Sequence, residues 1–174
     1  MTVLMSCEQR EFEQVNFQFQ IPISLAVLTH LTRHRMHSLI VPDFVPMWDL
    51  DNYKIPNSIR RNDEILYKSI FENNTHVYEQ FKSIGVKEED LVYFYLSGHM
   101  CNVVTSMNGR TLEWISRMRC CNKAQWEIRE ILNNMVGDIR TIAPLFGECL
   151  GATCEVLNYC PEGKETCGKV KVKK

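Results

Sequence analysis

The sequence predicts a mostly helical domain with a minor sheet, and two observations support this. Several long stretches place apolar residues at the spacing of an amphipathic helix, whereas only one early segment alternates clearly between apolar and polar residues. The length of 174 residues suits one domain, or a small domain with an appendage. No internal repeat is visible, and the only low-complexity segment is the lysine-rich end at 169–174.

The composition excludes several classes of protein. Twenty basic residues nearly balance 21 acidic ones, giving a net charge of −1. A chain so balanced is not expected to bind nucleic acid or an anionic membrane through its overall field. No apolar run approaches the ~18 residues of a membrane-spanning helix, and the N-terminus lacks the apolar core of a signal peptide. We therefore expect a cytoplasmic protein.

The N-terminal third predicts a strand and then a helix. Residues 12–21 carry an alternating apolar set, typical of a half-buried strand: Val15, Phe17, Phe19 and Ile21. Residues 22–36 begin with a proline that suits the first turn of a helix, and leucines follow at helical spacing. Residues 39–57 contain three prolines, which argue against a long helix there.

Helices dominate the remaining sequence. The predicted helices cover residues 62–84, 87–96, 109–119 and 122–141. Asn62 and Gly85 suit the start and the stop of the first of these, and Asn108 suits the cap of the third. Residues 103–107 predict a further strand or an extended connector.

A cluster of potential cations lies at the end of the first predicted helix. Arg33, His34, Arg35 and His37 fall within five positions. Like charges so close together cost free energy unless an anion relieves them, and arginine suits bidentate contacts with phosphate. The cluster is therefore a candidate phosphate site, although a solvated helix end that complements the helix dipole would use the same residues.

A second polar group lies in the last predicted helix. If the helix starts near residue 122, then Asn122, Gln125 and Arg129 share one face. Together with Arg119 such a face could orient a heterocycle that carries several hydrogen-bond acceptors. An ordinary amphipathic helix with Trp126 in the core is the alternative, and spacing leaves both open.

Cysteines are frequent near the C-terminus. Four of the eight lie in the last 26 residues, at Cys149, Cys154, Cys160 and Cys167. Four thiolates in such a tail predict a tetrahedral zinc site, although two disulfides or free buried thiols are alternatives. We accordingly divide the chain into a domain at 1–145 and a Cys-rich tail at 146–174.

Familiar catalytic motifs are missing from the sequence. It contains no G-x-G-x-x-G, no P-loop and no G-x-S-x-G, and no spacing indicates a nucleophile paired with a base. If the chain is an enzyme, a bound cofactor is expected to perform the difficult step.

Several motifs, in order and at matching distances, resemble one family. They are Glu13 in the first strand, Arg33-His34-Arg35, Asn108-Gly-Arg110-x-Leu112, and Arg119 followed by Ala124-Gln125-Trp126-Glu127-Ile128-Arg129. The pattern covers roughly residues 11–140 and resembles the flavin-dependent thymidylate synthases, the ThyX family. The Cys-rich ending also resembles the tails of some short members.

The resemblance implies an α+β fold with a small antiparallel sheet, and a homotetramer that shares FAD between subunits. It implies methylation of a pyrimidine nucleotide, dUMP, at C5. The carbon would come from methylenetetrahydrofolate and the electrons from NADPH through FAD. No enzyme nucleophile is needed in that scheme, in agreement with the missing motifs.

The resemblance also assigns roles to residues. By this resemblance FAD would be bound by Glu13, Arg33, His34, Arg35 and Arg119. We add Arg117 and Lys123 as candidate FAD ligands that the family pattern itself does not supply. The nucleotide would be bound by His30, Arg33, Ser38 and Arg129. Arg129 would be the catalytic residue, because a guanidinium beside N3 of the pyrimidine stabilises negative charge on the ring and raises the nucleophilicity of C5.

Some family positions differ here. Polar residues that follow the Arg-His-Arg triplet in the family fall on Ile40, Val41 and Val45. Arg117 and Lys123 replace an asparagine and a histidine, and we hypothesise that both share a cleft with Arg33 and compensate for the loss. Two alternatives remain: a related flavoenzyme that modifies another uracil nucleotide or nucleoside, and a non-catalytic subunit.

Overall fold

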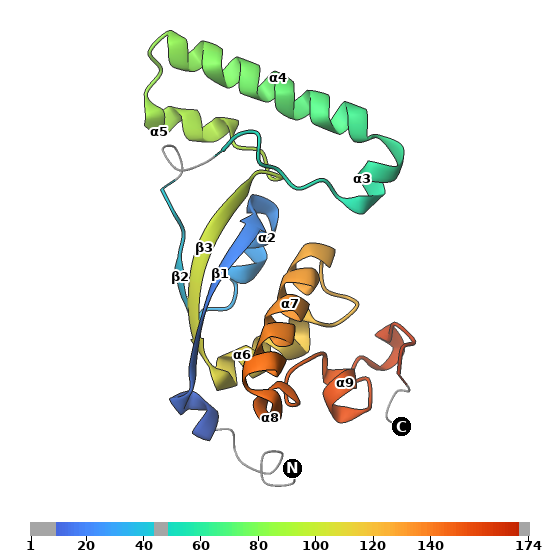
Figure 1. Ribbon diagram of the computed structural model, residues 1–174. Coiled ribbons are helices and arrows are strands. Elements are labelled where there is room, and N and C mark those ends of the chain that lie inside the picture. Colours follow the sequence, from blue (N-terminus) through green and yellow to red (C-terminus); the bar gives the residue numbers. More distant parts are fainter. Residues whose placement is uncertain (1–9, 44–48, 171–174) are drawn as a thin grey trace. The chain divides into compact units, whose positions relative to one another are not determined.

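The computed structural model describes residues 10–43 and 49–170 of the chain (Figure 1). The chain divides into two compact units. Unit 1 consists of residues 1–19, 30–39 and 105–174, and unit 2 consists of residues 20–29 and 40–104. The predicted family position at Val45 lies outside the described residues. Every residue to which the sequence assigned a cofactor, substrate or metal role belongs to unit 1.

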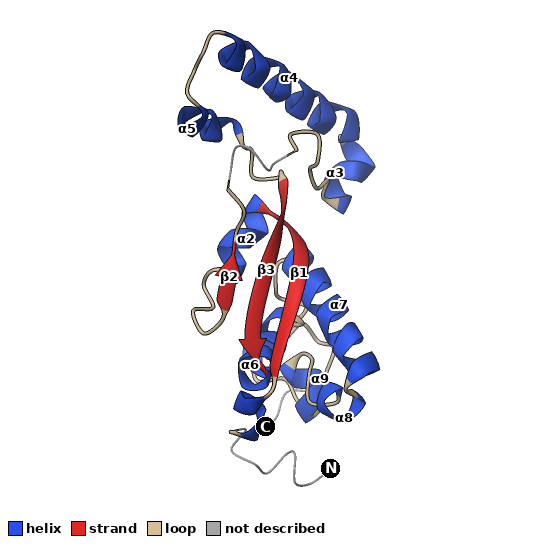
Figure 2. Cartoon of the chain, turned by 60° about the vertical axis from the view of Figure 1, so that its left-hand side comes forward, coloured by secondary structure: helices blue, strands red, loops and turns tan. Residues whose placement is uncertain are grey.

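The predicted minor sheet is confirmed as a three-stranded antiparallel sheet with the strand order β1-β3-β2 (Figure 2). The strands are β1 (Asn16–Ser24), β2 (Ser38–Ile40) and β3 (Met100–Asn108). The alternation seen in the sequence thus marks a real strand, and the extended segment predicted at 103–107 is part of the central strand. Along β3 every second residue is buried, including Val103 and Thr105.

The helix predicted at 22–36 is wrong at both ends. Helix α2 covers only Leu25–Leu31. Pro22 lies inside β1, exposed, next to the fully buried Ile23, so the period of two continues through the proline. Because β1 is at an edge of the sheet order, a residue without a backbone N–H is tolerated there. The Arg-His-Arg triplet consequently lies in a turn after α2 and not in a helix.

Unit 2 contains two short helices, α3 (Asn57–Asn62) and α5 (Glu88–Leu91), and the long α4 (Glu64–Ser83). Helix α4 confirms the helix predicted at 62–84, and α5 with the 3-10 turn η2 (Val92–Phe94) replaces the one predicted at 87–96. In Figure 1, α4 runs alongside α5, and the two helices are in contact. The buried Phe71 stacks on Tyr53, with ring centroids 4.0 Å apart.

Unit 1 is built around two helices, α6 (Gly109–Arg119) and α7 (Trp126–Ile142). Short elements accompany them, namely η1 (Glu11–Gln14), α8 (Pro144–Gly147), α9 (Thr153–Leu157) and η3 (Gly163–Glu165). The cap predicted for α6 is confirmed, since Oδ1 of Asn108 accepts a hydrogen bond of 2.9 Å from the backbone N–H of Thr111.

Helix α7 begins later than the helix predicted at 122–141. Its cap is Gln125, whose Oε1 accepts hydrogen bonds from the N–H groups of Glu127 at 2.8 Å and Ile128 at 3.0 Å. Residues 122–125 form a turn before the helix. Asn122, Gln125 and Arg129 therefore do not share a helical face, and that prediction is wrong.

The core of unit 1 lies where α6 and α7 are in contact. The fully or almost fully buried side chains are Leu112, Ile115, Ile128, Leu132, Val136 and Ile139. Burying a side chain of this kind contributes about 1.5–3 kcal/mol relative to leaving it exposed. This packing fixes the relative positions of the two helices whose polar residues form the candidate site.

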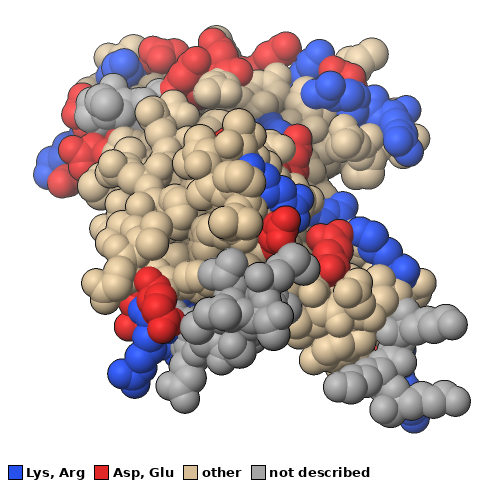
Figure 3. Space-filling view, turned by 60° about the horizontal axis from the view of Figure 1, so that its bottom comes forward, with Lys and Arg blue, Asp and Glu red and all other residues tan. Residues whose placement is uncertain are grey.

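The charged surface agrees with the nearly balanced composition. On the face shown in Figure 3, basic and acidic side chains lie close together in several small groups. In the part of the chain that the structure describes, no helix is both long enough and apolar enough to cross a bilayer.

Candidate functional site

The turn after α2 carries two exposed arginines. The backbone N–H of His34 donates a 3.0 Å hydrogen bond to the carbonyl of Leu31, which closes the first part of the turn. Arg33 and Arg35 are exposed on either side of His34. Neither has a carboxylate partner within residues 10–43 and 49–170. Two guanidinium groups without a counter-charge are suited to an anionic ligand.

Arg119 of α6 reaches this turn. Its Nε donates a 2.9 Å hydrogen bond to Nε2 of His34. Burial, and to a smaller extent the positive charges of Arg119 and His37, lower the pKa of His34 to about 4. Burial also lowers the pKa of Arg119, and so does the neighbouring Arg33. The structure therefore brings Arg33 and Arg119 together beside the neutral imidazole of His34.

The low pKa of His34 predicts a pH-dependent stability. In the unfolded chain the imidazole takes up a proton near its ordinary pKa of 6.5, whereas in the folded protein it does so only near 4. The unfolded state binds more protons in that window, so lowering the pH from 7 to 5 should destabilise the protein. We expect the urea midpoint, followed by circular dichroism, to fall less in His34→Gln than in wild type.

The matched control for this pH prediction is His76→Gln, because His76 is exposed on α4. This variant should retain the wild-type dependence of the urea midpoint on pH. Equal slopes for wild type, His34→Gln and His76→Gln would contradict the neutral state assigned to His34.

Arg117 and Lys123 line one pocket of about 220 Å³ together with Arg119. Each has a carboxylate partner: Arg117 pairs with the buried Glu113 one turn earlier, and Nζ of Lys123 lies 3.0 Å from Oε2 of Glu165. Arg33 does not line this pocket. This pocket therefore does not support the hypothesis that both cations share a cleft with Arg33, which stays a prediction, although Arg119 contacts the turn that carries Arg33.

Glu13 lies at a different pocket. Its carboxylate forms an ion pair with Arg110 of α6. This pocket, of about 680 Å³, is also lined by Met36, the residue after Arg35. Glu13 is thus placed beside the same turn as the two exposed arginines, with its charge already paired.

The remaining predicted residues have the following surroundings. His30 is half-buried in the last turn of α2. Ser38 begins β2, and its carbonyl accepts a 3.0 Å hydrogen bond from the hydroxyl of Thr105. Arg129 uses one terminal nitrogen to donate a 3.0 Å hydrogen bond to the carbonyl of Asn122, which ties α7 to the turn before it.

The predicted zinc set is not assembled. Within residues 10–43 and 49–170, no group of three or more His, Cys, Asp or Glu side chains is arranged to hold a metal ion. Cys149 is buried and does not line the 220 Å³ pocket, whereas Cys154, Cys160 and Cys167 line it together with Cys121. The four cysteines predicted from spacing are free thiols that do not form one cluster.

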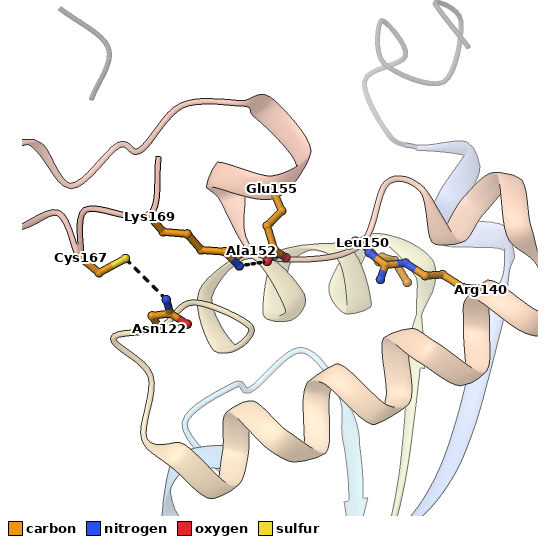
Figure 4. A network of polar contacts seen from close by, with 7 residues as sticks. All are labelled: Asn122, Arg140, Leu150, Ala152, Glu155, Cys167 and Lys169. Carbon is orange, nitrogen blue, oxygen red and sulfur yellow. Dashed lines mark hydrogen bonds and ion pairs between the residues drawn. The ribbon is translucent and has the colours of Figure 1, made fainter. Parts of the chain in front are cut away.

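Polar contacts hold the C-terminal tail on unit 1 (Figure 4). Arg140 of α7 donates to the carbonyl of Leu150 at 2.9 Å. Within the tail, Nζ of Lys169 lies 2.6 Å from Oε1 of Glu155. Nδ2 of Asn122, in the turn before α7, lies 3.8 Å from Sγ of Cys167 in the tail. The tail thereby covers one side of the pocket that Arg117, Arg119 and Lys123 line.

The sequence did not predict the contact between His37 and Thr105. His37 contacts Thr105 of β3, a fully buried threonine. The sequence contained a signal for Thr105, because it lies in phase with the apolar Val103 and Met107 on the buried side of the strand. The contact itself joins residues 68 positions apart, which no local pattern shows.

Comparisons with known proteins give one consistent result. A family model described as thymidylate synthase complementing protein matches residues 3–145. A flavin-dependent thymidylate synthase of Clostridium tetani is 32% identical over 178 residues, covering 90% of this chain and 71% of the relative. Another, of Nitratidesulfovibrio vulgaris, is 32% identical over 182 residues, covering 97% of this chain and 74% of that relative.

A solved structure has the same fold. Thymidylate synthase X of Helicobacter pylori, crystallised with FAD and dUMP, superimposes with a TM-score of 0.60. It is 19% identical and the match covers 78% of this chain and 73% of that one. The fold is therefore of the thymidylate synthase X class, with a cation-rich turn at its candidate site. The chain belongs to the thymidylate synthase complementing protein family, whose curated relatives here are flavin-dependent thymidylate synthases.

Proposed function

We propose that this chain is a flavin-dependent thymidylate synthase that methylates dUMP at C5. Methylenetetrahydrofolate supplies the carbon, NADPH supplies the electrons, and FAD relays them. Family membership supports the proposal, as do the names of the relatives and the FAD and dUMP of the similar solved structure.

The observation that carries the proposal is the turn with Arg33 and Arg35. FAD contains a diphosphate, and two exposed guanidinium groups without carboxylate partners in the described part of the chain fit its charge. Arg119 and the neutral His34 lie beside them. When bound, FAD would supply the electron transfer.

Arg129 acts on the nucleotide in this proposal. A guanidinium beside N3 of the pyrimidine favours the deprotonated ring and so strengthens C5 as a nucleophile. Its bond to the carbonyl of Asn122 occupies only one of its donors, so others remain for a ligand. Ser38 and His30 contribute further polar contacts to the nucleotide.

Self-association as a homotetramer is part of the proposal. Large apolar side chains are exposed on and just after α4, among them Ile65, Leu66, Ile70 and Ile84. Groups of exposed apolar residues of this kind mark surfaces that other protein chains cover. Light scattering coupled to gel filtration measures the assembly directly.

The decisive experiment is a tritium-release assay. The purified chain, supplied with FAD, NADPH and methylenetetrahydrofolate, should release tritium from dUMP labelled at C5, because the C5 proton leaves when the methyl group is introduced. Omission of any one component should stop release. Release from labelled UMP but not from dUMP would contradict the proposed substrate, and a protein that cannot be loaded with flavin would contradict the proposed class.

Replacing Arg33 with alanine should weaken flavin and nucleotide binding together, since one side chain is proposed to contact both. Loss of one charged hydrogen bond costs about 1.5–3 kcal/mol, which is about a ten- to hundredfold increase in each Kd. Flavin fluorescence and dUMP titration measure the two constants. Arg61→Ala, in the last turn of α3, is the control and should change neither. A normal flavin Kd in Arg33→Ala would refute the assigned contact.

A further inference from the structure

His37 bridges the two sides of the turn that carries the exposed arginines. Its Nδ1 lies 2.7 Å from the hydroxyl of Thr105 on β3. Its Nε2 lies 3.2 Å from the carbonyl of Leu31, the last residue of α2. The turn begins after Leu31, at the end of α2, and ends at His37. The imidazole of His37 therefore links the end of the turn both to the start of the turn and to strand β3.

The hydrogen-bonding roles in this bridge can be assigned. A carbonyl accepts only, so Nε2 of His37 carries a proton toward Leu31. If the imidazole is neutral, Nδ1 accepts the hydroxyl proton of Thr105, and that proton is then not donated to the carbonyl of Ser38. If it is charged, Nδ1 donates to Thr105, whose own proton then goes to the carbonyl of Ser38 at 3.0 Å. The contact between His37 and Thr105 exists in both states.

Two like charges, one in the turn and one on α6, lie near each other. Arg33 lies close enough to Arg119 to lower the pKa of that guanidinium. Other contacts also hold the turn: the carbonyl of Leu31 accepts the N–H of His34 at 3.0 Å, and Nε of Arg119 donates to His34 at 2.9 Å. The hydroxyl of Thr111 lies 3.4 Å from the carbonyl of Met36. His37 additionally connects the turn to the buried Thr105 of β3.

We infer that His37 is a positioning residue that keeps this turn closed and so holds Arg33 and Arg35 ready for an anionic ligand. Only the nature of that ligand, the diphosphate of FAD, rests on the proposed function. The imidazole itself need not touch the ligand, because both of its nitrogens are engaged by the protein.

Hydrogen–deuterium exchange of the ligand-free protein tests the closed turn. His37→Phe keeps a ring but removes both hydrogen bonds, and His76→Phe on α4 is the matched control. We expect the amide of His34 to exchange about tenfold faster or more in His37→Phe, as loss of a hydrogen-bonded tie implies. His76→Phe should exchange like wild type. An unchanged rate in His37→Phe overturns the inference.

Measuring FAD affinity tests whether the closed turn promotes ligand binding. It also separates the role of His37 from the proposed function. His37→Gln places an amide near the Nε2 position and should restore part of the FAD affinity that His37→Phe loses, expected to be about tenfold. Both variants should keep the circular dichroism spectrum of wild type. Should His37→Phe not fold, Thr105→Val takes its place with Thr105→Ser as the rescue. Wild-type FAD affinity in all folded variants overturns the inference. A wild-type chain that binds no FAD instead overturns the proposed function, and the exchange result still decides the role of His37.

Discussion

Arg129→Ala is expected to lower the turnover of dUMP by about a hundred- to thousandfold, the usual effect of removing one donor that stabilises charge in a transition state. The proposed role requires a fixed positive charge beside N3 of the ring, and alanine leaves none. The fold should survive, because Arg129 is only half-buried and its bond is to the carbonyl of Asn122 at the surface. Single-turnover tritium release and circular dichroism measure the two effects.

Two further variants make this result specific. Arg129→Lys keeps the charge but not the planar set of donors, so it should recover only part of the rate. Asn133→Ala replaces an exposed residue one turn further along α7 and should leave the rate unchanged. Turnover of Arg129→Ala within threefold of wild type would remove Arg129 from the mechanism and leave the flavin site untouched.

The sequence predicted the local elements where one signal dominates. Helix α6 is an example, since Asn108 caps it as predicted, and α4 follows its apolar spacing. The prediction of secondary structure from the sequence failed where one residue is favourable in two kinds of element. Pro22 is favourable both in a first helical turn and on an edge strand, and only the pairing of β1 at the edge of the sheet decides between them.

Prediction of the site was limited in the same way. The motif order brought Arg33, His34 and Arg119 into one group, and the structure joins them through the 2.9 Å bond between Arg119 and His34. The zinc set failed because spacing cannot show the path of the tail, in which Cys149 is buried away from the pocket that the other three cysteines line. Contacts between distant segments decide such sites, and a single sequence does not contain them.

Glu113→Leu is expected to lower the free energy of unfolding by about 3 kcal/mol, the lower end of the range for removal of one partner from a buried ion pair. The Glu113 side chain is 4% exposed and that of Arg117 is 22% exposed, so water can solvate the remaining guanidinium only in part. Burial raises the pKa of Glu113, and the charge of Arg117 opposes that shift, so the carboxylate depends on its partner.

The double variant Glu113→Leu with Arg117→Met shows whether the loss comes from the charge left behind. Replacing both partners of a buried pair with apolar side chains is often neutral or stabilising, so the double variant should recover most of the stability. The control is the more exposed pair of Glu64 and Lys68 on α4, which has the same spacing and an N–O distance of 2.8 Å. Glu64→Leu should lower the free energy of unfolding far less than Glu113→Leu does, because solvent screens this pair. Urea unfolding of wild type, Glu113→Leu, Arg117→Met and the double variant gives the coupling energy of the pair. A double variant as unstable as Glu113→Leu would mean that packing around the α6 carboxylate, and not its unpaired partner, accounts for the loss.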